Sequence, residues 1–168
     1  MLTDIITEFE SAQSRLISTL NGFTENNFNV IPFEGSWSAA QVTEHLLKAN
    51  SGAVHTLKGK TKEAARKPDE NEDMIRSIFL NFETKMQSPE FILPSSEPKE
   101  QEDMITKHIR TGDELRKIAT GEDLSQLCTD FSLQNMGELT RYEWICFVTC
   151  HTRRHTHQLE NILNIVNK

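Results

Sequence analysis

Two histidines near the end of the chain, His151 and His155, lie four residues apart in the segment HTRRH. On an α-helix this spacing places two side chains about 40° apart around the axis and one turn apart along it, so both rings can reach one cation. Imidazole nitrogens bind divalent ions at about 2.0–2.1 Å. The alternative is that each ring is a core residue satisfied by a hydrogen bond, and the pair alone does not decide between these interpretations.

A third histidine, His45, is predicted on the inward face of a helix, among small and apolar neighbours such as Val42 and Ala49. Three neutral imidazoles with room for a water molecule describe an open metal site of the catalytic type. Such an ion keeps its full charge, so it can lower the pKa of a water for hydrolysis or bind a thiol as thiolate for transfer to an electrophile. The residues do not choose between these reactions.

Other side chains of suitable chemistry are predicted to lie outside the site, on other helix faces or in the core: His55, His108, His157, Cys146 and Cys150. A zincin protease carries a glutamate directly after its first histidine ligand, and Thr152 occupies that place here. The chain also lacks the GxSxG, P-loop and dinucleotide-binding patterns. These absences argue against zincin-type peptide hydrolysis and nucleotide chemistry.

Four stretches with apolar residues three or four positions apart predict the long helices that must carry these side chains. They run to about Leu20, over about 38–57, from just after Pro98 to near Ala119, and over about 140–166. Capping boxes, Ser38 with Gln41 and Thr140 with Glu143, mark the starts of the second and the fourth. The fourth helix holds both late histidines within an otherwise apolar stripe.

A further, shorter helical pattern covers 74–86 and is set by apolar residues at helical spacing: Met74, Ile75, Ile78, Phe79, Phe82 and Met86. Ile109 is expected inward on the third long helix, and Phe23, Phe28 and Phe33 are expected to close the end of a bundle. Residues 58–73 are predicted to be a solvated loop. The long connections at 21–36, 87–98 and 121–139 argue against simple up-down-up-down wiring. We therefore expect an all-α bundle with one extra short helix.

Composition narrows the class of protein further. A chain of 168 residues with 36% apolar residues suits one domain over 1–168. The net charge of −7 disfavours nucleic acid as a partner. Three cysteines without a CxxC motif favour a reducing compartment, and no signal peptide or membrane-spanning segment is recognisable. We expect a cytoplasmic protein that does not contact a membrane.

The segments SWSAAQVTEHL and GELTRYEWICFVTCHTRRHTHQLENI resemble the DinB / YfiT-like superfamily of metal-dependent enzymes. The family signature combines a Trp-Ser helix start leading to a histidine with a late H-x3-H followed by a glutamine. An arginine often precedes the second of these late histidines, and the matching residues here are Trp37, His45, His151, Arg154, His155 and Gln158.

This resemblance implies a four-helix bundle with a three-histidine site for zinc, nickel or a similar ion, in a homodimer. Some relatives transfer low-molecular-weight thiols such as bacillithiol, and others are described as hydrolases. The function expected here is a metal-dependent thiol S-transferase or hydrolase acting on a small molecule. Gln158 and Glu138 are candidate hydrogen-bonding groups around the ligands. The alternative is a non-catalytic small-molecule or metal-binding stress protein on the same bundle.

Overall fold

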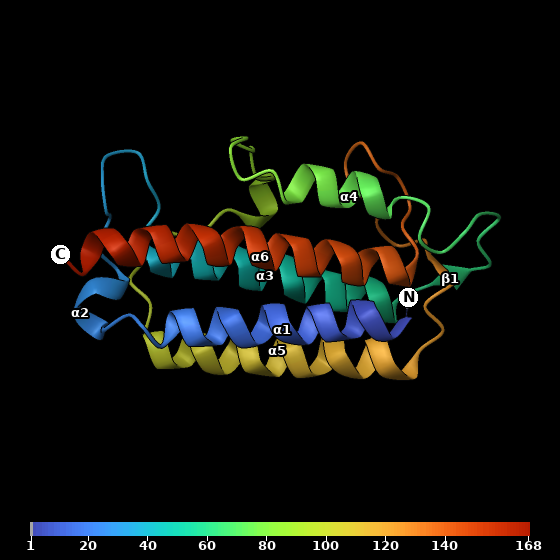
Figure 1. Ribbon diagram of the computed structural model, residues 1–168, viewed down its shortest axis with the longest axis horizontal. Helices are drawn as coiled ribbons and strands as arrows, with labels where there is room; N and C mark the ends of the chain where they lie inside the picture. Colours follow the sequence, from blue (N-terminus) through green and yellow to red (C-terminus); the bar gives the residue numbers. More distant parts are fainter. Residues whose placement is uncertain (1) are drawn as a thin grey trace.

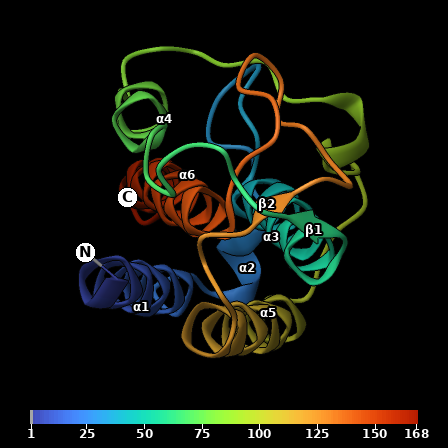
Figure 2. The ribbon, with the colours of Figure 1, turned by 90° about the vertical axis from the view of Figure 1, so that its right-hand side faces the viewer.

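The computed structural model describes residues 2–168, with side chains from residue 4 onward; Met1 lies outside the described residues. Within this range four long helices form the bundle: α1 (Leu2–Leu20), α3 (Ala39–Lys58), α5 (Gln101–Gly121) and α6 (Arg141–Val166). Seen along their length, they occupy the corners of a square in the order α1, α6, α3, α5 (Figure 2). The predicted all-α bundle is confirmed.

Ion pairs and hydrogen bonds between the helices establish their directions. Glu8 and Arg15 of α1 pair with Arg153 and Glu160 of α6, so these two helices run parallel. The backbone oxygen of Leu57, near the end of α3, accepts a hydrogen bond from Arg141 at the start of α6, which makes that pair antiparallel. Figure 1 shows α1 and α6 running one way and α3 and α5 the other. The predicted departure from up-down-up-down wiring is confirmed.

Both predicted capping boxes form. The Ser38 hydroxyl accepts a hydrogen bond from the Gln41 backbone N–H, and the Gln41 side chain accepts one from the Ser38 N–H. Thr140 and Glu143 make the same reciprocal pair at the start of α6. Because each box satisfies N–H groups that a helix start leaves unpaired, these two helix starts are fixed by local chemistry.

The connections contain short elements that the periodicity did not predict. Helix α2 (Glu25–Phe28) closes one end of the bundle, and a 3-10 turn, η1 (Glu90–Ile92), lies in the crossing that leads into α5. Strands β1 (Thr61–Lys62) and β2 (Leu127–Cys128) pair antiparallel at the other end. Residues 58–73 contain no buried residue, as expected of a solvated loop, but Thr61 and Lys62 form a strand that the sequence did not predict.

The extra helix, α4 (Glu72–Phe79), is shorter than predicted and packs on the outside of α6 (Figure 1). Only one of its faces can meet the bundle, so Ile75 and Phe79 are buried. The other apolar residues of the helical pattern are exposed: Met74, Ile78, Phe82 and Met86. The last two lie beyond the end of the helix.

Two predictions about buried residues are wrong. Phe23 and Phe28 are buried at the bundle end as expected, but Phe33 is 59% exposed on a turn that projects away from the helices. Ile109 is 46% exposed because it lies in a surface groove between α1 and α5. No described helix combines the length and hydropathy that a bilayer-spanning segment needs.

Candidate metal centre

The bundle brings His45, His151 and His155 together from two neighbouring helices. His45 lies in the middle of α3, and the other two lie one turn apart in the middle of α6. Their side chains are 1%, 6% and 8% exposed, respectively. The three residues predicted from helical spacing therefore form one buried group.

The Nε2 atoms of all three rings point at a common space. His151 Nε2 is 3.4 Å from His45 Nε2 and 3.0 Å from His155 Nε2, and one ligand nitrogen from each ring lies within 4.8 Å of the others. Two nitrogens that bind one ion at about 2.0–2.1 Å in tetrahedral geometry are about 3.3 Å apart. The separations of 3.0 and 3.4 Å from His151 Nε2 lie on either side of that value.

The opposite ring nitrogens determine which tautomers are present. His45 Nδ1 is 3.0 Å from the Ile92 carbonyl oxygen, and His155 Nδ1 is 2.9 Å from Gln158 Oε1. Since these oxygens only accept, both Nδ1 atoms carry the proton and both Nε2 atoms present lone pairs. A proton on His151 Nε2 could be donated to only one of these two lone pairs. A cation between the rings accepts a lone pair from all three Nε2 atoms.

Burial keeps the three imidazoles neutral. It is the main cause that lowers the pKa of His45, lowers that of His155 to about 3, and holds that of His151 well below the usual value. The neighbouring rings and Arg154 add to the effect on His151 and His155. A neutral ring is the form that binds a metal ion, so the site requires no proton release from these side chains near neutral pH.

Aromatic side chains enclose the group. The Trp37 ring lies 5.2 Å from that of His45, and Phe147 stacks on His151 at 5.2 Å with an interplanar angle of 15°. Phe79, at the end of α4, meets His151 edge-on at 5.8 Å. His151 Nδ1 is buried without a hydrogen-bond partner among the described residues. These apolar walls lower the local dielectric and strengthen electrostatic interactions at the site.

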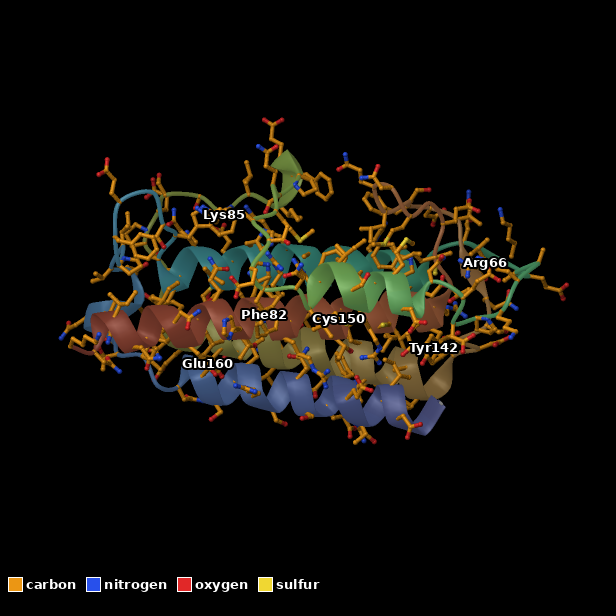
Figure 3. All side chains as sticks on the ribbon, turned by 45° about the horizontal axis from the view of Figure 1, so that its top comes forward. Arg66, Phe82, Lys85, Tyr142, Cys150 and Glu160 are labelled. Carbon is orange, nitrogen blue, oxygen red and sulfur yellow. The ribbon has the colours of Figure 1, made fainter. Side chains whose placement is uncertain are left out.

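The segment between α4 and α5 covers the site and is hydrogen-bonded to both helices that carry the histidines. Arg154 donates hydrogen bonds to the carbonyl oxygens of Asn81 and Thr84. On the other side, Ile92 accepts the bond from His45, and Lys48 donates to the Leu93 carbonyl. Phe82 stacks on His157 at 4.6 Å, over α6 (Figure 3).

The remaining candidate residues lie elsewhere. The prediction for Glu138 needs correction: its carboxylate pairs with Lys62 of β1, because Glu138 precedes α6 and lies at the end of the bundle. Gln158 is in contact with His155, as described above. The other candidates lie outside the group of ligands: His55 and His157 are exposed, and His108, Cys146 and Cys150 are buried apart from it.

Some groups at the site could not be found from sequence patterns. The Ile92 carbonyl belongs to the backbone of an irregular segment, so no side-chain motif signals it. Phe79 and Phe147 looked like ordinary core residues. Trp37 had a signal, because it directly precedes the capping box of the helix that carries His45. Among the described residues no carboxylate belongs to the group, so the ligands leave the charge of an ion uncompensated.

Comparison with known proteins agrees with this geometry. The family model described as the DinB superfamily matches residues 8–159, a range that includes all three histidines and Gln158. The chain is also similar to a Bacillus subtilis (strain 168) protein named "Uncharacterized protein YuaE", with 26% identity over 160 residues that cover 92% of this chain and 94% of the relative. Through a match that extends over most of its length and contains its buried histidine group, the chain belongs to the DinB superfamily.

Proposed function

We propose that the protein is a metal-dependent enzyme acting on a small molecule, with a divalent ion held by His45, His151 and His155. The observation that carries this proposal is the convergence of three buried Nε2 atoms. Those of His45 and His155 present lone pairs, because the Nδ1–H of each ring donates a hydrogen bond to an oxygen outside the group. Zinc and nickel are the proposed ions, since both accept imidazole ligands.

The groups around the three histidines orient the rings and shield them from water. Gln158 and the Ile92 carbonyl hold two rings in the tautomer that binds metal, and Trp37, Phe79 and Phe147 exclude water around them. When bound, a divalent ion supplies a charge that lowers the pKa of a water or a thiol placed against it. No described carboxylate lies in the group to act as a general base.

Thiol transfer fits this site better than hydrolysis. A free thiol has a pKa of about 8.5, far below that of bulk water, so it needs far less help to lose its proton. A site without a built-in base therefore suits a low-molecular-weight thiol. In the proposed reaction the thiol proton leaves to solvent, the sulfur forms a bond to an electrophilic carbon, and the leaving group departs with the bonding electrons.

An activity assay tests this proposal. The metal-loaded protein is incubated with a panel of low-molecular-weight thiols and a fluorogenic alkylating electrophile, and the same reactions are run with His155→Ala and with the matched control His157→Ala. We expect thiol-dependent turnover by the wild type and the control, and loss of most turnover in His155→Ala. Ester hydrolysis without thiol consumption would instead indicate a hydrolase. If neither thiols nor esters react, the enzymatic proposal fails.

A non-catalytic binding protein is the second candidate, and the missing carboxylate favours it. In that case the bundle would hold the ion or a small ligand under the covering segment without turnover. Calorimetric titration that shows metal binding, together with inactivity across the thiol and ester panels, would support this candidate.

We also propose a cytoplasmic homodimer. The three cysteines are free and buried, which suits a reducing compartment. Several large apolar side chains are exposed on the crossing loops, as expected of a surface that meets a second copy; they include Ile31, Phe33 and Phe91. Sedimentation velocity over a range of protein concentrations distinguishes a dimer from a monomer.

A further inference from the structure

The apolar core of the bundle is divided along its length into two clusters of buried side chains. On α1 the first cluster reaches Phe9 and the second begins at Leu16; on α6 the first reaches Cys150 and the second begins at Leu159. The four stretches between the clusters, here called the middle layer, are residues 10–15, 48–52, 106–114 and 151–158. At 1.5 Å per residue this layer is about 8–14 Å thick.

Each long helix places a polar side chain in the middle layer: Gln13, Asn50, His108 and Thr152. The last three are at most 1% exposed, and the Gln13 amide atoms are also inaccessible. Within residues 4–168, no hydrogen-bond partner is found for either amide atom of Gln13 and Asn50, for His108 Nδ1 or for Thr152 Oγ1. Buried polar atoms in native proteins are paired with protein or with ordered water, because leaving them unpaired is unfavourable.

The chemistry of these atoms restricts what they can bind. The Nε2–H of His108 donates to the Thr43 carbonyl oxygen at 2.9 Å, so its Nδ1 is an acceptor. Burial lowers the pKa of His108 to about 4, against the effect of the bond to Thr43, so the ring is neutral. The Gln13 and Asn50 amides and the Thr152 hydroxyl each donate and accept. A neutral partner with both donor and acceptor capacity matches this set.

A route from solvent reaches this layer at Gln13. The surface groove between α1 and α5 has a volume of about 690 Å³ and is lined by Gln13, Gly112 and Ile109, among others. The Gln13 amide lies over Gly112, where an added Cβ would be 3.1 Å from Gln13 Nε2. The groove is on the side of the bundle opposite α4 and the loops that cover the histidines (Figure 2).

We propose that Gln13, Asn50, His108 and Thr152 bind a cluster of internal water molecules in the middle layer, filled from the α1–α5 groove past the Gln13 side chain. The middle layer contains two of the three histidines, His151 and His155, which lie on the same stretch of α6 as Thr152. This proposal does not depend on whether the protein is an enzyme.

Water–protein nuclear Overhauser effects on the uniformly 13C/15N-labelled full chain test the proposal. We expect cross-peaks between water and the His108 ring protons with the sign of long-lived contacts. The exposed His55 of α3 serves as the control and should show only effects of bulk exchange. Absence of water cross-peaks at resolved His108 signals would overturn the proposal, as would a through-bond coupling between His108 Nδ1 and the Gln13 amide. A cross-peak to a solute other than water would also overturn it.

A substitution provides a second readout. Asn50→Leu removes two polar atoms from the layer at similar volume, and we expect the water cross-peaks of His108 to fall by at least half. Ser51→Leu, at the neighbouring exposed position, should leave them unchanged. Unchanged cross-peaks in a folded Asn50→Leu chain would remove Asn50 from the site and contradict the proposal. If this variant does not fold, the wild-type spectra decide alone.

Discussion

The hydrogen bond from His155 to Gln158 makes a quantitative prediction about metal affinity. Gln158 Oε1 lies 2.9 Å from His155 Nδ1 and keeps the proton there, so that Nε2 presents its lone pair to the site. In Gln158→Ala this bond is lost, and a buried N–H is left without its partner. Such a change costs about 1–3 kcal/mol, and loss of a group that orients a ligand lowers metal affinity about 10- to 100-fold.

Competition titration against a chelator of known affinity measures this effect. Asn161→Ala is the control, because the Asn161 amide donates a hydrogen bond to Nε2 of His157, on the same helix and outside the ligand group. We expect a loss of at least tenfold for Gln158→Ala, no change for Asn161→Ala, and retained affinity for Gln158→Glu, whose carboxylate also accepts from Nδ1–H. An affinity of Gln158→Ala within twofold of wild type would refute the reasoning.

Two further predictions concern Glu143, at the start of α6, and Arg154, which binds the covering segment. Buried Glu143 accepts hydrogen bonds from Arg66 and two backbone N–H groups, so Glu143→Gln should lower the free energy of unfolding by about 2–3 kcal/mol, measured by urea unfolding. Glu160→Gln, at a partly exposed residue whose partner Arg15 is exposed, should lower it by less than about 1 kcal/mol. Burial raises the pKa of Glu143, but the hydrogen bonds of its carboxylate outweigh burial and lower the pKa from the ordinary value of 4.5. The carboxylate therefore stabilises the fold fully above that pH, and this stabilisation is lost as the pH falls through the lowered pKa. The difference in unfolding free energy between wild type and Glu143→Gln should shrink in acid. Arg154→Ala should speed tryptic cleavage after Lys85, in the covering segment (Figure 3), on the order of tenfold, while Arg153→Ala should not.

The parts of the fold that the sequence predicted correctly depend on local rules. Ser38 with Gln41 and Thr140 with Glu143 satisfy their own helix starts, so their positions need no knowledge of the rest of the chain. The i, i+4 spacing likewise placed His151 and His155 on one face. His45 joined them because its inward neighbours showed which face of its helix is buried.

The predictions that failed depended on contacts between distant segments. The apolar spacing over 74–86 continues past Phe79, but a helix outside the bundle has only one face to bury and ends early. Glu138 lies near the last helix in sequence, yet its partner is Lys62, in a segment whose path no local pattern sets. The backbone carbonyl of Ile92 reaches His45 for the same reason and was missed.

The central claim is that three histidines hold one divalent ion, and metal analysis of protein purified without a polyhistidine tag tests it most directly. Elemental analysis after loading with zinc or nickel and removal of excess ion should give about one ion per chain for wild type and for His157→Ala. His45→Ala and His155→Ala should retain less than about a tenth of that amount. Stoichiometric, chelator-resistant binding in either of these two variants, or no binding by folded wild type, would contradict the claim.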